Sequence, residues 1–167
     1  MRHKKGFTIA EVIVASVLVV IIAAVAYNFY VLAKDAWFHV FAQGDMQTEA
    51  ILGIEKMLYG VDATRKGVLE AQDIITPGDG TTTSVLRFVD QDDININRFF
   101  SKQADTLVYT NENGINTVII NGDVQTLTFT RPAGQPDIVD INLVLQRAIR
   151  GKVITVNLST SARIRNI

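Results

Sequence analysis

Twenty-two consecutive residues near the start of this 167-residue chain carry no formal charge. They lie between Glu11 and Lys34 and are mostly Val, Ile, Leu and Ala. At about 1.5 Å of rise per residue, a helix of this length crosses a hydrocarbon core about 30 Å thick. The segment therefore needs lipid or other apolar segments around it, and the sequence predicts a membrane-spanning helix.

The charges before this run predict its orientation. Arg2, Lys4 and Lys5 precede it with no acid among them, so the positive-inside bias keeps the N-terminus cytoplasmic and sends the rest outward. A secretory signal peptide is cut after its apolar core at small residues, but here Tyr27-Asn28-Phe29-Tyr30 follows the core. The composition instead changes sharply before the core, between Gly6 and Phe7.

Residues 4–12, KKGFTIAEV, resemble the class III signal of type IV pilins and pseudopilins: a short basic leader, Gly, then Phe-Thr-x-x-Glu opening an apolar helix. The resemblance implies that a prepilin peptidase cuts between Gly6 and Phe7, that Phe7 is then N-methylated, and that Glu11 acts in filament assembly. Ala10 replaces the larger aliphatic residue common in the family, which is a mild departure. The implied segments are a leader at 1–6 and a transmembrane and filament-core helix at 7–33.

The position of Glu11 supports the same role on physical grounds. An acid inside a membrane segment is costly and by default indicates a functional site with a partner. Cleavage after Gly6 creates a positive amine on Phe7, which can neutralise the Glu11 carboxylate of a neighbouring subunit in a low-dielectric core. Breaking one side of such a buried pair costs about 3–5 kcal/mol, so the pair fixes the register of the subunits. The alternative is a glutamate solvated near the lipid headgroups.

Composition limits the rest of the chain. Removal of residues 1–6 takes away three of the 16 bases and leaves 13 against 17 acids, a net side-chain charge of −4. This balance argues against a nucleic-acid-binding surface, although contact with DNA through a local patch stays open. The chain has no cysteine, so no disulfide can stabilise an exported domain.

The helical pattern continues beyond Ala33 as an amphipathic segment at 34–64. An apolar stripe repeats at i, i+3, i+7 and i+10 and consists of Ile51, Ile54, Leu58 and Val61. We expect this stripe to seat the helix on a sheet and the helix to end near Thr64. Residues 65–83 then read as a connection containing Pro77-Gly78-Asp79-Gly80.

The remainder of the β-rich globular head, 65–167, contains short runs rich in β-branched and aromatic residues. The predicted strands are 85–89, 94–100, 106–110, 115–120, 124–130, 138–145 and 153–161. Asn121-Gly122 predicts a two-residue hairpin, and Gly114 marks another turn. The predicted fold class is α+β, one long N-terminal helix packed on an antiparallel β-sheet, as the resemblance to pilins also implies.

A second, more diffuse resemblance concerns the head. Residues 43–50, Ile96-Asn97-Arg98 and the run 156–166, which ends in Arg-Asn, are similar to the J-type pseudopilins of type II secretion and the W-type minor pilins. This resemblance implies a low-abundance subunit near the tip of a filament.

Catalytic and metal chemistry find little support. His3 leaves with the leader and His39 adjoins the membrane segment, so no triad or zinc set can form in the head. Asp90, Asp92 and Asp93 form the main acidic cluster, but they lack the spacing of a calcium loop. We therefore expect no enzyme activity, no cofactor and no metal.

Two function classes stay open. In the first, the chain is a structural subunit of a type IV pilus or a type II secretion pseudopilus, held in the bacterial inner membrane and then built into a filament. Its partners would be other pilin subunits, the prepilin peptidase, the assembly platform of the cytoplasmic membrane, and lipid before assembly. In the second, it is a single-pass membrane-anchored binding protein that does not polymerise.

Overall fold

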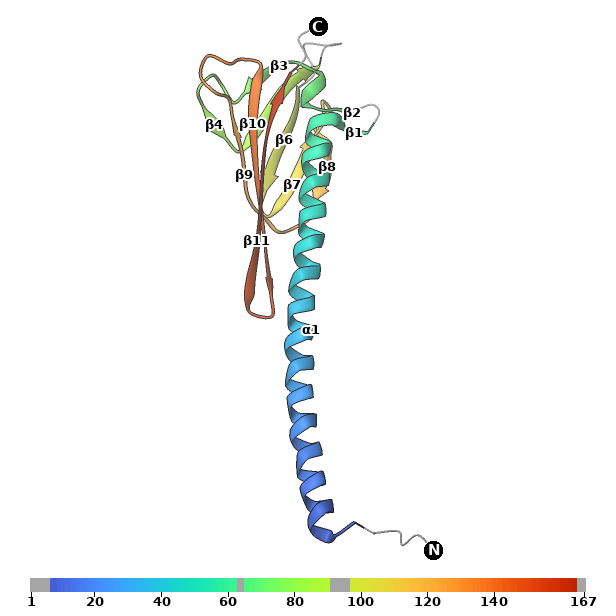
Figure 1. The fold of residues 1–167 in the computed structure, drawn as a ribbon. Helices are drawn as coiled ribbons and strands as arrows, with labels where there is room; N and C mark the ends of the chain where they lie inside the picture. Colours follow the sequence, from blue (N-terminus) through green and yellow to red (C-terminus); the bar gives the residue numbers. More distant parts are fainter. Residues whose placement is uncertain (1–6, 63–64, 91–96, 165–167) are drawn as a thin grey trace, which may run out of the picture. The chain divides into compact units, whose positions relative to one another are not determined.

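The computed structural model describes residues 7–62, 65–90 and 97–164. The chain divides into two compact units, residues 1–41 and residues 42–167. One helix, α1 (Ile9–Tyr59), crosses the boundary between them. The first unit contains the apolar part of α1, and the second contains the rest of the helix with the β-structure (Figure 1).

Eleven strands and one short 3-10 helix follow α1 in the described parts of the chain. They are β1 (Gly60–Asp62), β2 (Arg65–Lys66), η1 (Val68–Glu70), β3 (Ala71–Thr76), β4 (Thr82–Thr83), β5 (Val85–Asp90), β6 (Asn97–Gln103), β7 (Thr106–Thr110), β8 (Asn116–Ile120), β9 (Val124–Thr130), β10 (Ile138–Ile149) and β11 (Lys152–Arg163).

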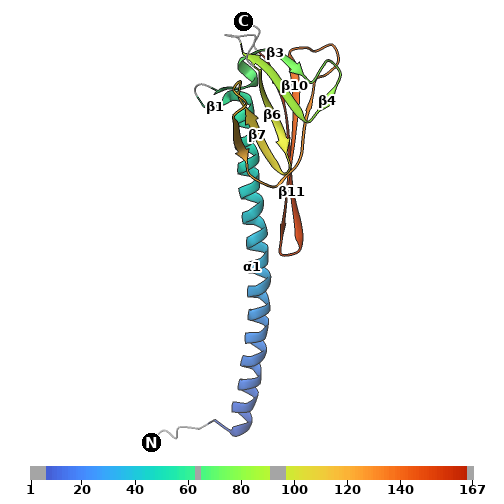
Figure 2. The ribbon, with the colours of Figure 1, turned by 180° about the vertical axis from the view of Figure 1, so that it is seen from behind.

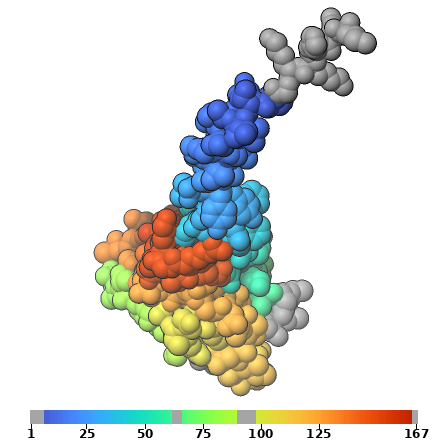
Figure 3. Space-filling model, turned by 90° about the horizontal axis from the view of Figure 1, so that it is seen from below, coloured from blue at the N-terminus to red at the C-terminus, as the bar shows by residue number. Residues whose placement is uncertain are grey.

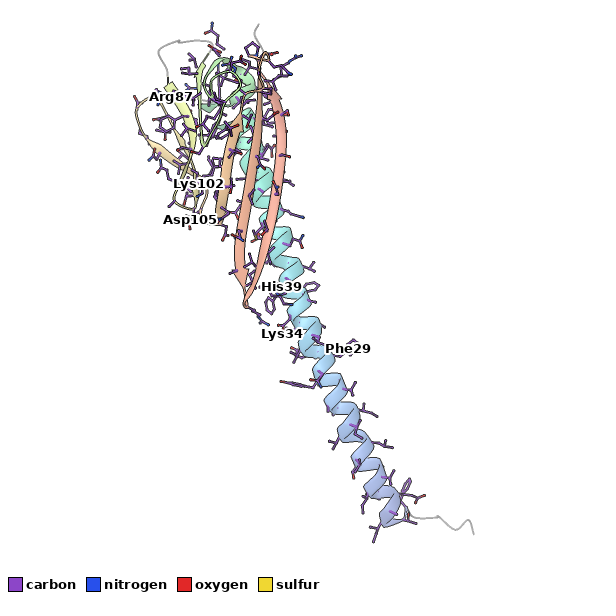
Figure 4. All side chains as sticks on the ribbon, turned by 90° about the vertical axis from the view of Figure 1, so that its left-hand side faces the viewer. Phe29, Lys34, His39, Arg87, Lys102 and Asp105 are labelled. Carbon is purple, nitrogen blue, oxygen red and sulfur yellow. The ribbon has the colours of Figure 1, made fainter. Side chains whose placement is uncertain are left out.

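In the first unit, the side chains along the apolar length of α1 are exposed. Every residue from Phe7 to Lys34 is exposed, and Figure 4 shows Phe29 pointing away from the helix axis. The helix is long and apolar enough to span a membrane by length and composition. A helix that is apolar on all sides is stable only when lipid or other helices surround it.

The second unit contains two main antiparallel sheets. Five strands in the order β3-β5-β6-β7-β8 form one sheet, and four in the order β11-β10-β9-β4 form the other. A separate two-stranded ribbon joins β1 to β2. Figure 2 shows the five-stranded sheet from behind, with β6 and β7 beside the C-terminal part of α1. The expectation of a long helix packed on antiparallel β-structure is confirmed.

One hydrophobic core joins α1 to both sheets. Phe88, Phe100 and Tyr109 come from three adjacent strands, with ring centroids 5.8 Å apart for the first pair and 5.1 Å for the second. All three rings are buried. Leu127 and Phe129 of β9 are buried too, as the alternation of apolar and polar residues in that strand predicts.

The face of α1 that meets this core differs in part from the predicted stripe. Ile54, Leu58 and Val61 are partly buried against the core, the last from β1 rather than from the helix, but Ile51 is 56% exposed. The buried helix positions are small residues and methionines: Ala42, Met46, Ala50, Gly53 and Met57. A Cβ built on Gly53 would lie 2.6 Å from Cδ1 of Ile120. The sheet therefore approaches the helix closely at Gly53, where there is no side chain. A sequence pattern based on large apolar residues does not predict this contact face.

The helix ends at Tyr59, so the prediction of an end near Thr64 was too long. Gly60 follows with a φ of +106°, a left-handed conformation that stops a helix and that glycine adopts without strain. A Cβ on Gly67 would collide with the backbone oxygen of Leu58 and the backbone nitrogen of Gly60. Two glycines thus let the chain turn back closely against the end of the helix.

The strand predictions are confirmed for 106–110 and 124–130 and nearly so for 85–89 and 115–120. Residues 94–96 of another predicted strand lie outside the described residues, and its remainder belongs to β6. The connection predicted for 65–83 was wrong in part, because it contains β3 and β4. The strand predicted at 138–145 continues to Ile149, and that at 153–161 extends to Lys152 and Arg163.

The hairpin predicted at Asn121-Gly122 was also wrong. Gly122 and Asp123 do have positive φ angles, 84° and 64°. However, β8 pairs with β7, whereas β9 pairs with β10 and β4, so this turn crosses from one sheet to the other. Backbone hydrogen bonds hold the crossing: the N–H of Val124 donates to Asp105 O, and that of Gln146 donates to Asp123 O. The turn predicted at Gly114 does join paired strands, β7 and β8.

The longest hairpin joins β10 to β11. Its register runs from Ile138↔Arg163 to Ile149↔Lys152, and Arg150 and Gly151 form the turn with φ angles of 50° and 77°. Two positive φ values in a two-residue loop match the right-handed twist of the strands. Figure 3 shows the red strand β11 on the surface of the second unit.

Candidate functional site at the start of the helix

The first turn of α1 is closed by a reciprocal pair of side chains. Thr8 precedes the helix, and its hydroxyl accepts a hydrogen bond from the backbone N–H of Glu11 at 3.3 Å. The Glu11 carboxylate in turn accepts bonds from the backbone N–H of Thr8 at 2.9 Å and from its hydroxyl at 3.0 Å. This arrangement is a capping box, in which two helix-end donors are satisfied at once.

Phe7 lies just before this cap. It is outside the helix, and its side chain is 87% exposed. Phe7 and Glu11 line the same shallow apolar hollow along one face of α1, together with Val12, Ala15 and other residues of the next two turns. Of the two residues at the expected cleavage point, Phe7 is therefore in non-helical chain, whereas Gly6 lies outside the described residues.

The Glu11 carboxylate retains capacity for a further partner. Both hydrogen bonds from Thr8 go to Oε2, and a carboxylate offers about four acceptor positions. The side chain is exposed at the edge of the apolar hollow. The site can therefore receive a cationic donor from another molecule without giving up the helix cap.

Residues 1–27 match the family model described as the prokaryotic N-terminal methylation motif. Neither curated proteins nor solved structures gave a match. The motif and the α+β fold, with a long N-terminal helix on antiparallel sheets, support a type IV pilin-like precursor. Such a motif implies processing by prepilin peptidase and assembly with other pilins, and with the apolar helix it suits a protein anchored in the inner membrane.

Sequence reasoning did not identify Thr8 as the partner of Glu11. The signal was present, because Thr-x-x-Glu before an apolar run is the sequence pattern of a capping box. Glu11 thus combines two requirements in one side chain: it caps its own helix and keeps a carboxylate at the start of an apolar segment.

A second charged site was also missed, and it lies in the second unit. The Arg147 guanidinium of β10 donates to Asp123 from Nε at 2.6 Å and contacts Asp45 and Glu49 of α1 at 3.4 Å each. Burial raises the pKa of Glu49, and Arg147 opposes this shift. The spacing i, i+4 of the two helix acids was the available signal, but their basic partner lies about a hundred residues away in the sequence.

We expect Arg147→Met to destabilise the second unit by about 1–2 kcal/mol at pH 7.5, because three carboxylates lose their shared cation. The loss should be smaller near pH 5. Without Arg147 the pKa of Glu49 rises further, and an acid with a raised pKa in the folded state costs stability as pH increases through that pKa. Thermal unfolding of the detergent-solubilised full chain at both pH values measures this difference. A loss that is equal at the two pH values would contradict the assignment.

The acidic cluster considered for a metal contributes little to the described structure. Asp90 ends β5, and Asp92 and Asp93 lie outside the described residues. Within residues 7–62, 65–90 and 97–164, no three acidic, histidine or cysteine side chains are grouped so as to hold a metal ion.

Proposed function

We propose that this chain is the precursor of a structural subunit of a type IV pilus or type II secretion pseudopilus. The observation that carries the proposal is Glu11, a carboxylate held by Thr8 at the start of a helix whose next 22 residues are uncharged. In a filament built from these helices, the amine of a processed neighbour neutralises this carboxylate. The role is structural rather than catalytic.

Within that class, we propose a minor subunit that acts at the filament tip or in initiation. The support is the resemblance of residues 43–50 and 156–166 to J-type pseudopilins and W-type minor pilins. The described part of the second segment forms most of β11, an edge strand of the four-stranded sheet. Quantification of the chain against the other subunits in sheared filaments tests this role, because a tip subunit is present in far fewer copies than the repeating subunit.

We expect prepilin peptidase to cut the chain between Gly6 and Phe7. In its native host, the wild-type chain should yield a mature form that begins at N-methylated Phe7. Gly6→Leu should leave the chain uncleaved, because a large side chain beside the scissile bond obstructs the peptidase. Intact-mass and N-terminal peptide mass spectrometry of membranes and sheared filaments measures both outcomes. Normal processing of the Gly6→Leu chain would count against the peptidase assignment.

The alternative is an anchored binding protein that never polymerises. It predicts a chain that still begins at Met1 in every fraction. It also predicts that substitution of Glu11 leaves the function of the protein unchanged. The same mass measurement therefore separates the two functions. The exposed, non-helical position of Phe7 favours processing, because a peptidase requires an accessible and extended substrate.

A further inference from the structure

The charges of this chain are unevenly distributed along the sequence. Residues 141–167 contain five bases and no acid. Residues 7–140 contain the other eight bases that remain after processing and all 17 acids. Every formal charge in residues 141–167 is thus positive, although the chain as a whole is acidic, and most of this segment belongs to the β10–β11 hairpin.

Three of these five bases, Arg147, Arg150 and Lys152, lie at or beside the end of the hairpin. The pairing of β9 with β10 stops at Val124↔Leu145, whereas β10 and β11 continue together to Ile149↔Lys152. In Figure 1 the two strands extend past the ends of their neighbours. We call residues 148–153 the hairpin tip. Its tight two-residue turn and paired strands give it a fixed shape.

The tip lies at the end of the second unit where the chain arrives from the apolar segment. Arg147, the last residue before the tip, contacts Asp45 and Glu49, which lie near the start of this unit at Ala42. Three further residues at about 3.3 Å each carry the turn about 10 Å past Arg147. Only residues 34–41 separate the uncharged run from this unit, a tether that reaches at most about 30 Å.

The surface of the tip suits a lipid headgroup layer. Arg150 and Lys152 are exposed, and Val153 is 60% exposed beside them. Each Lys or Arg near an anionic bilayer contributes about 1 kcal/mol of attraction, equivalent to about a fivefold change in binding. An apolar side chain next to these cations can enter the boundary between headgroups and acyl chains.

We infer that the hairpin tip docks on the anionic surface of the membrane that holds the apolar helix. This inference rests on the membrane-anchored stage of the proposed function and on no step of filament assembly. The docked tip would hold the second unit against the bilayer until the subunit is extracted.

The absence of native cysteines allows a direct test on the full chain. Val153→Cys carries an environment-sensitive fluorophore, and the protein is reconstituted into vesicles containing a headgroup quencher. We expect quenching at least about twofold greater in phosphatidylglycerol-rich than in phosphatidylcholine vesicles, with the difference lost in about 0.5 M salt. A label at Gln135→Cys, exposed in the turn at the opposite end of β10, should show neither effect.

Charge reversal provides the matched comparison. Lys152→Glu in the labelled chain should remove the preference for anionic lipid, whereas Arg87→Glu makes the same change in net charge on β5 and should leave it intact (Figure 4). Equal quenching at positions 153 and 135 would overturn the inference. So would a signal that follows protein density instead of anionic lipid, because a second copy would then be the partner.

A third label separates this inference from the proposed function. Val20→Cys lies within the uncharged run and reports insertion through quenchers placed on the acyl chains. Quenching at position 20 without quenching at position 153 overturns the docked tip alone. Failure of quenching at position 20 overturns membrane anchoring itself, and with it both proposals.

Discussion

Glu11→Gln is expected to reduce incorporation of the chain into filaments at least tenfold while membrane insertion stays at the wild-type level. Glutamine at this position can still complete the capping box, so the helix keeps its first turn. What it loses is the negative charge, and the amine of a neighbouring subunit is then buried without a partner. Removing one member of a buried ion pair costs about 3–5 kcal/mol, which exceeds a factor of 100 at equilibrium.

The matched control is Thr8→Val. It removes the hydroxyl that exchanges hydrogen bonds with Glu11 but leaves the carboxylate and its charge. We expect this variant to assemble nearly normally. The measurement is the ratio of each variant in sheared filaments to the same variant in membranes. Equal ratios for Glu11→Gln and wild type would contradict an assembly role for Glu11. A reduced ratio for Thr8→Val alone would show that the helix cap, and not the charge of Glu11, is what assembly requires.

Gly67→Ala is expected to destabilise the second unit by about 3 kcal/mol, near the upper end of single-substitution effects. The added Cβ would overlap the backbone oxygen of Leu58 and the backbone nitrogen of Gly60. Backbone atoms at the end of a helix cannot rotate away as a side chain can. The strain therefore falls on the connection between α1 and the first strands, where Val68 is fully buried in the core.

Gly44→Ala is the matched control for this variant. Gly44 lies inside α1, and a Cβ built there meets nothing within 4 Å. Because alanine is the better helix former, we expect a gain of about 0.5–1 kcal/mol. Urea or thermal unfolding of the solubilised full chain measures both variants. A Gly67→Ala chain as stable as wild type would show that the turn against the helix end is not closely packed.

Local features of the sequence predicted much of the fold. The apolar run, the long helix and most of the strands of the second unit follow from periodicity and composition, which act over a few residues. The strand at 124–130 is an example, because alternation alone indicated that Leu127 and Phe129 face the core. The capping box at the start of α1 lies within one helical turn, so its pattern was present in the sequence although it was not identified, and the roles of Gly6, Phe7 and Glu11 in processing and assembly stay predictions.

The features that sequence reasoning missed depend on contacts between distant residues. The chain does turn at Asn121-Gly122, but the positive φ angles fall on Gly122 and Asp123, and long-range pairing decides which strands the turn joins. Arg147 meets Asp45 and Glu49 only after β10 has folded beside the helix. The buried face of α1 is the one that β8 approaches at Gly53. Ile51 is large and apolar but lies off this face, so it stays exposed.

The exposed apolar surface of α1 also limits how the subunit can be transferred out of the membrane. More than a dozen large apolar side chains from Phe7 to Leu32 are over a third exposed. At about 2 kcal/mol for each side chain, placing them in water would cost roughly 30 kcal/mol. A free aqueous subunit is therefore not an accessible intermediate. The helix can leave the lipid only by moving directly into another apolar environment, such as the packed helices of a filament. Any assembly that extracts it must therefore act at the membrane surface.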